Sequence, residues 1–234
     1  MNTGWIEKWN PIQLLAPNAC LHCQQPLSGP LCKPCLSQLE TIAGKGCRQC
    51  SNPLVHCDAM ICQWCSRLSV LPQKVCTLFA YREVGRTVFH KIKYEGYWPL
   101  VEPLLQEGLH GFFRTMPFLE YACIMPIPES FSRKIKRHFN PADILAVALS
   151  EKTGLPVSRE LKMNVFQRHQ VGLGYEERRK NTKKRFRVSG PNMPETVILV
   201  DDVLTTGATL EAATRACLRA GARKVAWLTL FRRL

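Results

Sequence analysis

The fold of this chain is decided by the stretch VILVDDVLTTGAT, which runs from Val197 to Thr209. Its first four residues are consecutive aliphatic side chains, a pattern typical of a strand that is buried on both faces of a parallel sheet. The aspartate pair is predicted to close this strand, and a Thr/Gly loop then leads into a helix that we expect to start near Leu210. The order of strand, acidic pair, loop and helix is typical of a ligand site in an α/β protein.

The loop and the acidic pair together predict a sugar-phosphate site. A phosphate at the loop would meet backbone N–H groups, hydroxyls and the positive end of the helix dipole. Gly207 permits the turn and lets the backbone approach an anion closely. Asp201 and Asp202, at the C-terminal end of a parallel strand, can accept hydrogen bonds from the two hydroxyls of a ribose. The alternative interpretation is a buried strand with a solvated acidic cap and a threonine-rich helix N-cap.

The run VILVDDVLTTGATL resembles, at every position, the 5-phosphoribosyl-1-pyrophosphate (PRPP) motif of type I phosphoribosyltransferases. The resemblance implies a doubly wound, mostly parallel sheet in which Asp201 and Asp202 are the catalytic pair and bind the ribose hydroxyls. It also implies that PRPP is bound together with Mg²⁺. The residues that it assigns to the 5′-phosphate are Thr205, Thr206, Gly207, Ala208 and Thr209.

A second apolar strand, predicted from Tyr121 to Ile127, runs into a loop marked by two prolines and then into a group of cations. This region resembles the ComF family (ComFC/GntX-like competence proteins), whose proline-bearing strand is followed by basic residues and the signature Arg-Gly-Phe-Asn-Gln. Here residues 137–141 read Arg-His-Phe-Asn-Pro, and His138 in the glycine position restricts the backbone that would approach pyrophosphate. The cations predicted to contact pyrophosphate or DNA are Arg133, Lys134, Arg137 and Arg178.

The segment from Arg178 to Arg187 carries seven cations in ten residues. Such a run makes a strong positive field, and contact with nucleic acid or polyphosphate explains it as well as a solvated surface does. Phe186 would either stack on a base or anchor a hairpin to the core. Lys93 and Tyr94 resemble the family's Lys-Tyr/Phe-x-Gly turn, and they either face the ligand or mark the end of a surface helix.

Cysteines dominate the N-terminal third, where ten of the twelve lie between Cys20 and Cys76. Eight of them form four Cys-x-x-Cys pairs, and four thiolates around one ion is the geometry that zinc prefers. We therefore predict one or two structural Zn²⁺ ions, with neighbouring pairs joined in the simplest arrangement and a cross-braced arrangement as the alternative. The predicted ligands are Cys20, Cys23, Cys32 and Cys35 for one ion and Cys47, Cys50, Cys62 and Cys65 for the other.

Other uses of these cysteines are less favoured by the sequence. Disulfides need an oxidising compartment, and residues 1–19 lack the long apolar core of a secretory signal. Redox-active pairs are expected within a thioredoxin-like βαβ frame, and iron–sulfur ligation is a minority alternative. We expect a cytoplasmic protein without a transmembrane segment, recruited to the inner face of the membrane by its partners.

The sequence divides into two predicted domains. Residues 1–72 have few large apolar runs and are predicted to be a Cys-rich double zinc-ribbon domain, stabilised by about 10 kcal/mol from each metal site. Residues 73–234 are long enough for one phosphoribosyltransferase-like α/β domain. Strands are expected at 75–81, 121–127, 197–200 and 224–231, and helices at 85–93, 100–113, 143–152 and 210–220. Cys217, on the last helix, is predicted to be a core residue.

The charge balance favours anionic partners. The formal net charge is +14, and about +10 remains after eight thiolates and two Zn²⁺ ions are counted. Such an excess favours salt-sensitive binding of single-stranded DNA. The ComF resemblance implies that the protein binds PRPP and carries incoming single-stranded DNA into the cytoplasm during natural transformation, beside a helicase-like ATPase of the competence machinery. The alternative is an active phosphoribosyltransferase that moves ribose 5-phosphate from PRPP to an acceptor and releases pyrophosphate.

Overall fold

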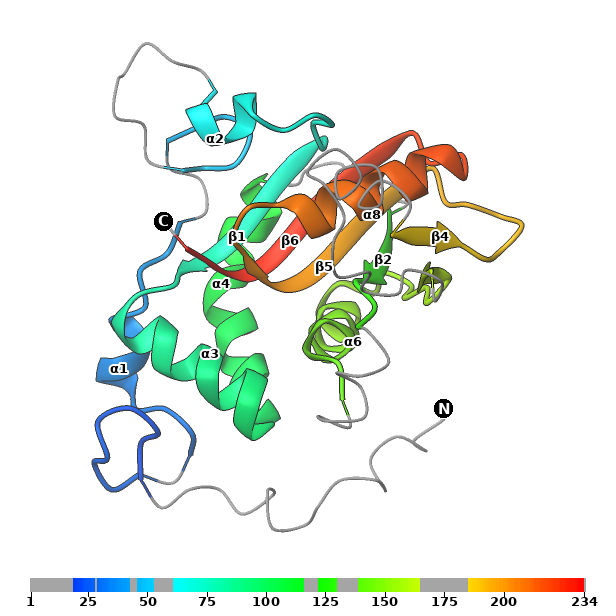
Figure 1. Cartoon of the computed structure of the whole chain (residues 1–234). Coiled ribbons are helices and arrows are strands. Elements are labelled where there is room, and N and C mark those ends of the chain that lie inside the picture. Colours follow the sequence, from blue (N-terminus) through cyan, green and yellow to red (C-terminus); the bar gives the residue numbers. More distant parts are fainter. Residues whose placement is uncertain are drawn as a thin grey trace, which may run out of the picture.

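A four-stranded parallel sheet, in the order β1-β6-β5-β2, forms the centre of the protein (Figure 1). Its strands are β1 (Lys74–Ala80), β2 (Ala122–Pro126), β5 (Thr196–Leu204) and β6 (Lys224–Arg232). Two short strands, β3 (Leu161–Met163) and β4 (Phe186–Val188), form a separate antiparallel pair. The computed structural model describes residues 19–27, 29–42, 46–52, 61–115, 122–129, 139–164 and 185–233. The predicted α/β fold with a mostly parallel sheet is confirmed.

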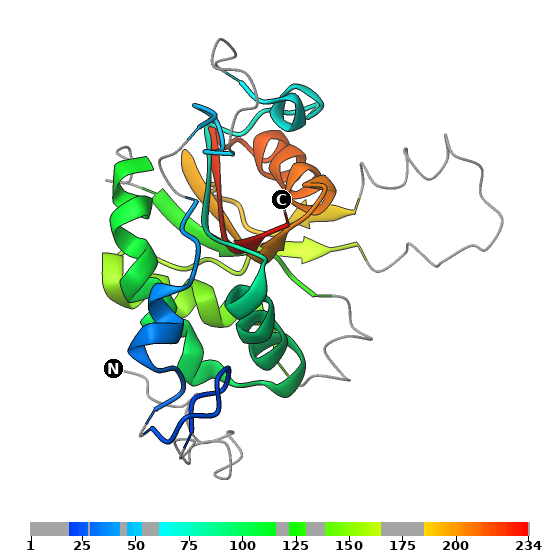
Figure 2. The same ribbon diagram turned by 90° about the vertical axis from the view of Figure 1, so that its left-hand side faces the viewer.

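Helices cover both faces of this sheet. On one face, α3 (Glu83–Glu95), α4 (Val101–Thr115) and α6 (Pro141–Thr153) share a core with Ile198 and Val200 of β5. On the other face, α8 (Ala208–Arg219) and the β3–β4 pair share a core with Val197 and Leu199. Figure 2 shows α4 and α6 on the opposite side of the sheet from α8. The aliphatic run of β5 is therefore buried on both faces, as predicted.

The cysteine-rich segment contributes to both cores. The short helix α1 (Lys33–Ser37) lies beside α3, whereas α2 (Gln63–Ser66) lies at the opposite end of the sheet (Figure 1). The cysteines around α1 belong to the core under α3 and α4, and those around α2 belong to the core under α8. A 3₁₀ helix, Trp98–Leu100, joins α3 to α4. The division of the chain at residue 72 stays a prediction.

Two element boundaries near the acidic pair differ from the prediction. Strand β5 continues through the aspartates to Leu204 because β6 still supplies a partner, with Leu204 opposite Arg232. Strand β2, in contrast, ends at Pro126 opposite Val200, so the acidic pair lies beyond the end of β2. Helix α8 begins directly after Gly207, whose φ of 82° makes the turn, and thus two residues before the predicted start.

The β3–β4 pair is not among the predicted elements, because three-residue strands show too little periodicity to be recognised. Phe186 on β4 is buried within the core under α8, so its role as a hairpin anchor is confirmed and base stacking is excluded. Cys217 is also a core residue, as predicted, and burial raises the pKa of its thiol to about 12.

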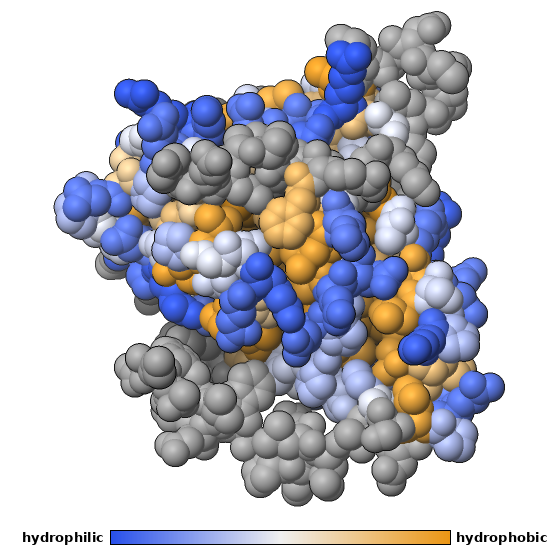
Figure 3. Space-filling model, turned by 180° about the vertical axis from the view of Figure 1, so that it is seen from behind, coloured by the Kyte–Doolittle hydropathy of each residue, from blue (hydrophilic) through white to orange (hydrophobic). Residues whose placement is uncertain are grey.

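The surface mixes apolar and hydrophilic residues, as Figure 3 shows for the face behind the view of Figure 1. The most exposed large apolar side chains come from separate elements, and single residues of this kind are normal on a protein surface. They are Ile61, Leu71, Tyr94, Phe113, Val147 and Leu218. None of the helices in the described ranges has both the length and the apolar character needed to cross a bilayer.

Candidate functional site

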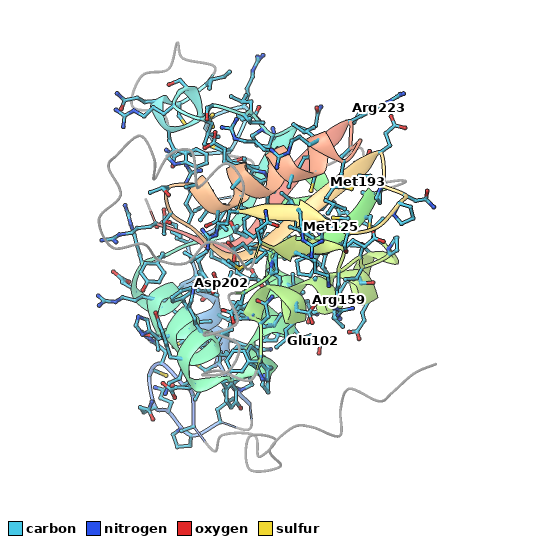
Figure 4. The ribbon with its side chains drawn as sticks, turned by 45° about the vertical axis from the view of Figure 1, so that its right-hand side comes forward. Glu102, Met125, Arg159, Met193, Asp202 and Arg223 are labelled. Atoms are coloured by element: carbon cyan, nitrogen blue, oxygen red, sulfur yellow. The ribbon has the colours of Figure 1, made fainter. Side chains whose placement is uncertain are left out.

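The acidic pair lies at the C-terminal end of β5, where α3 approaches the sheet. Lys93, in the last turn of α3, places its Nζ 2.6 Å from Oδ2 of Asp202, and both side chains are largely buried. The backbone N–H of Asp202 donates a hydrogen bond of 2.9 Å to Oδ1 of Asp201. In Figure 4, Asp202 lies between α3 and the end of the sheet. Of the two alternatives for the Lys93 turn, Lys93 faces the site, whereas the neighbouring Tyr94 is exposed.

Burial and a neighbouring charge raise the pKa of Asp201. Desolvation at the strand end, together with the negative charge of Asp202, raises the pKa of Asp201 to about 8, and Lys93 counteracts part of this rise. A carboxyl group in this state can carry a proton near neutral pH and can therefore donate or accept a hydrogen bond. The pair thus offers two oxygen-rich side chains beside one lysine, which suits a ligand that bears vicinal hydroxyls.

The residues from Thr205 to Thr209, here called the phosphate loop, join β5 to α8. Gly207 is the N-cap of α8 and makes no side-chain capping bond, so the first N–H groups of the helix are oriented toward the loop. Thr205, Thr206 and Ala208 are exposed, and the hydroxyl of Thr206 accepts a 3.4 Å hydrogen bond from the N–H of Ala208. The loop thus combines backbone donors, hydroxyls and the positive end of a helix, which together suit a phosphate.

The acidic pair and the two ends of the phosphate loop, Thr205 and Thr209, line one pocket of about 210 Å³. Arg185, just before β4, reaches this pocket, and its Nη1 donates a 3.4 Å hydrogen bond to the hydroxyl of Thr209. Asn140 lines the pocket from the other side, where it caps α6 and donates a 2.9 Å hydrogen bond to the carbonyl of Ile127. Asn140 therefore holds the loop after β2 against the start of α6.

The structure brings together the acidic pair and the phosphate loop, but it tests neither their predicted roles nor those of the upstream cations. The positions of Arg133, Lys134, Arg137 and Arg178 lie outside the described residues, as does that of His138. Arg185 belongs to the predicted basic run, but the sequence gives no sign that it differs in role from the other cations of that run. It can be recognised only through its contact with Thr209, which lies 24 residues further along the chain.

The eight paired cysteines form two groups, and in each group the four Sγ atoms lie within 4.8 Å of one another. The first cysteine group is Cys20, Cys23, Cys32 and Cys35, and the second is Cys47, Cys50, Cys62 and Cys65. Joining of neighbouring pairs is thus confirmed, and the cross-braced alternative is wrong.

The geometry of both groups fits a tetrahedral ion. The Sγ atoms of Cys23 and Cys32 are 3.6 Å apart, and those of Cys50 and Cys62 are also 3.6 Å apart. A tetrahedron with Zn–S bonds of about 2.3 Å has S–S edges of about 3.8 Å, whereas a disulfide would need about 2.05 Å. In the second group the N–H of Cys62 also donates to Sγ of Cys47, at 3.2 Å, which stabilises a thiolate. His56 and Cys57 lie outside the described residues.

The comparisons with known proteins agree with this architecture. The model of the family "Phosphoribosyl transferase domain" matches residues 180–234, which include β5, the phosphate loop, α8 and β6. This match covers the acidic pair and the phosphate loop, and its start precedes Arg185. The predicted phosphoribosyltransferase domain is therefore confirmed.

Three competence proteins are similar to the chain over most of its length. "Competence protein F" of Haemophilus influenzae is 27% identical over 222 residues, which cover 88% of this chain and 93% of the relative. "Competence protein ComFC" of Bacillus subtilis is 28% identical, with 96% and 89% covered. "Competence protein ComFC" of Streptococcus pneumoniae is 27% identical, with 86% and 87% covered. The resemblance predicted from the motifs is thereby confirmed: the chain is similar to ComF competence proteins over most of its length, it matches a phosphoribosyltransferase model at its C-terminal end, and it carries two N-terminal four-cysteine groups.

Proposed function

We propose that this chain binds PRPP in the pocket between β5 and α8 and assists the uptake of single-stranded DNA into the cytoplasm during natural transformation. One observation carries the PRPP assignment. An acidic pair, a helix N-terminus with a threonine-rich loop, and two cations converge on one pocket, although they come from separate parts of the chain.

Each part of the pocket has a role in this proposal. The phosphate loop and the N-terminus of α8 bind the 5′-phosphate, and Arg185 adds a cation beside Thr209. Asp201 and Asp202 accept hydrogen bonds from the ribose hydroxyls. Lys93 orients Asp202 and lies where it can neutralise the pyrophosphate. Mg²⁺ that arrives with PRPP would supply further neutralisation of the pyrophosphate oxygens.

The competence assignment is supported by the names of the relatives and by the charge of the chain. All three relatives are named competence proteins, and the formal charge of +14 suits single-stranded DNA. In this proposal the upstream cations contact DNA or pyrophosphate, and both cysteine groups hold structural Zn²⁺. The partner is a helicase-like ATPase of the competence machinery, and the complex works in the cytoplasm at the inner face of the membrane.

Calorimetry tests the PRPP assignment. The protein is titrated with PRPP and Mg²⁺, and it is compared with a variant that carries both Asp201→Ala and Asp202→Ala. Glu102→Ala is the matched control, because this exposed carboxylate pairs with Lys152 and lies away from Asp202 (Figure 4). We expect the double substitution to weaken binding at least about 100-fold, since the hydrogen bonds to both ribose hydroxyls are lost. Unchanged binding in the double variant would remove the assignment.

Fluorescence anisotropy tests the DNA assignment with a labelled single strand at 50 and 200 mM salt. We expect binding at low salt that weakens about tenfold or more at high salt, because binding releases counterions from the DNA. Absence of binding at low salt would contradict this part of the proposal and leave PRPP binding intact.

The alternative function is phosphoribosyl transfer, and the intact pocket favours it. In this reaction the bond between the anomeric carbon and pyrophosphate breaks, pyrophosphate leaves with the bonding electrons, and an acceptor attacks the carbon and loses a proton. The pocket would position PRPP and stabilise the charge on the leaving group. Release of pyrophosphate in the presence of a candidate base or amine, measured with a coupled enzyme assay, would establish turnover.

A further inference from the structure

The back of the phosphate loop, away from the pocket, packs against the second cysteine group. Trp64 lies on α2 between Cys62 and Cys65, and its ring meets Trp227 of β6 edge to face, with a centroid distance of 6.4 Å. A Cβ atom added at Gly207 would lie 2.9 Å from Cζ2 of Trp64. It would also lie 3.4 Å from Cδ2 of Leu68, just after α2. Gly207, at the turn of the loop, is therefore in direct contact with the segment that carries the second cysteine group.

A buried cation connects the same segment to the end of the sheet. Arg232, opposite Leu204 at the end of β6, is 2% exposed, and its guanidinium lies 4.3 Å from the ring of Trp64. Its Nη1 donates a 3.4 Å hydrogen bond to the carbonyl of Cys50. No carboxylate pairs with Arg232 within the described ranges. Four thiolates around one Zn²⁺ carry a net charge of −2, so the loaded group supplies a countercharge for this arginine.

A third contact joins the chain after α2 to the helix that follows the phosphate loop. Oε1 of Glu211, in the first turn of α8, accepts hydrogen bonds from the N–H of Ser69 at 2.6 Å and the N–H of Val70 at 2.9 Å. Arg215, one turn later, pairs with Glu211 at 3.0 Å. The start of α8 is thus attached to the cysteine-rich segment by side-chain-to-backbone bonds as well as by packing.

The position of α2 depends on its cysteines. A four-residue helix is far too short to be stable by itself, so its place in the protein is set by packing and by the ligands at its two ends. Cys62 is the N-cap residue of α2 and Cys65 lies in its last turn. A metal ion at the second group would therefore fix Trp64 in place, and its loss would release Trp64 from Gly207.

We propose that the metal-loaded second cysteine group holds the phosphate loop in its anion-binding conformation, with Trp64 as the positioning residue. The first cysteine group has no such role. Among the described residues its buried cysteines belong to the core under α3 and α4, and Nδ1 of His22 lies 3.1 Å from the hydroxyl of Thr87 on α3. That this metal affects PRPP affinity rests on the proposed function. That the metal orders the phosphate loop does not, because loop order can be measured without PRPP.

The test uses amide hydrogen exchange of residues 203–210 in the full-length protein, without ligand. Trp64→Ala removes the contact and keeps all eight cysteines, and Cys65→Ser removes one ligand of the second group. His22→Ala is the control, because His22 also directly precedes the second cysteine of its pair and joins the first group to α3. Trp64→Phe is the conservative variant. Metal content and the thermal midpoint are measured for every protein.

We expect exchange in the phosphate loop to rise about tenfold or more in Trp64→Ala and in Cys65→Ser, and to change less than about twofold in His22→Ala. Trp64→Phe should restore most of the protection. If Cys65→Ser does not fold, Trp64→Ala with its full metal content decides the question. Unchanged loop exchange in Trp64→Ala, or an equal rise in His22→Ala, overturns the proposal.

Calorimetry with PRPP and Mg²⁺ on the same proteins measures the consequence for binding. We expect Trp64→Ala to weaken PRPP binding about tenfold and His22→Ala to leave it within about twofold. If the unaltered protein binds no PRPP, the proposed function fails, and the exchange data still decide whether the second group orders the loop. If PRPP binds equally well to Trp64→Ala, the group does not control phosphate affinity.

Discussion

The first cysteine group packs under α3 on one face of the sheet, and the second packs beside the phosphate loop at the end of β6 on the other face. The two groups share their ligands, their spacing pattern and a short helix in the second pair, yet their surroundings differ. The first includes the exposed Cys23, whereas all four cysteines of the second are buried. Two chemically similar four-cysteine groups thus pack against different parts of the fold, and among the residues that the structure describes only the second lies against the phosphate loop.

Stepwise removal of metal should have the largest effect on stability, and it should distinguish the roles of the two cysteine groups. The exposed Cys23 gives a chelator access to the first group, so we expect its ion to leave first. Each ion contributes about 10 kcal/mol of folding free energy, and loss of both should abolish cooperative unfolding. Native mass spectrometry during titration with a chelator, combined with PRPP calorimetry, measures the order. If PRPP binding is lost when the first group releases its ion, the second group is not the one that supports the phosphate loop.

Substitution of Gly207 should be the next most costly change. Gly207→Ala imposes a side chain on a residue with a φ of 82° and drives a Cβ atom into Trp64. We expect a loss of about 3 kcal/mol of folding free energy, from backbone strain and overpacking together. Gly154→Ala is the control, because Gly154 has a φ of 73° but no atom within 4 Å of the added Cβ. Its cost should be only about 1 kcal/mol.

The contact between Gly207 and Trp64 can be isolated with a double-mutant cycle in urea unfolding. If Trp64 causes the overpacking, Gly207→Ala should cost less in a Trp64→Ala background than in the unaltered protein. Equal costs in the two backgrounds would show that the strain is confined to the backbone, and they would weaken the assigned role of the second group.

Lys93→Met should have an intermediate effect on stability, and it tests the contact between α3 and the acidic pair. The substitution keeps the apolar stem but leaves Asp202 largely buried without its cation. We expect a loss of about 2 kcal/mol of folding free energy, together with weaker PRPP binding. Lys91→Met is the matched control on the same helix, since Lys91 pairs with the exposed Glu95. Similar losses in both variants, measured by urea unfolding, would argue against a special role for Lys93.

The pH dependence of stability should isolate the ionisation of Asp201 in the acidic pair. The pKa of Asp201 is raised to about 8 in the folded protein, from an ordinary value of 3.8. Its contribution to stability is therefore most favourable below pH 4 and declines as the pH rises toward 8, because the unfolded chain ionises first. We expect Asp201→Asn to be about as stable as the unaltered protein at pH 4 and to become progressively more stable than it as the pH rises to 8.

Asp143→Asn is the control for this measurement, because Asp143 pairs with Arg159 at the surface. Thermal unfolding between pH 4 and pH 8 should show no comparable gain in that variant. A gain of the same size at both pH values in Asp201→Asn would indicate that the effect does not come from ionisation.

The strands of the central sheet, the helices that cover it and the membership of both cysteine groups could be predicted because their signals are local. An aliphatic run, a glycine turn and a Cys-x-x-Cys pair each lie within a few residues. The continuation of β5 past Asp202 could not be predicted, because it depends on pairing with β6. The same holds for Arg185, which reaches the site through a tertiary contact, and for the placement of Trp64 behind Gly207. For Lys93 the sequence left two alternatives, and its contact with Asp202 decides between them.

A crystal structure of the protein with PRPP and Mg²⁺ tests the central claim most directly. We expect the 5′-phosphate within hydrogen-bonding distance of the backbone N–H groups of residues 205–209, with the ribose hydroxyls on Asp201 and Asp202. Clear density for PRPP at any other place on the protein, with this pocket empty, would contradict it.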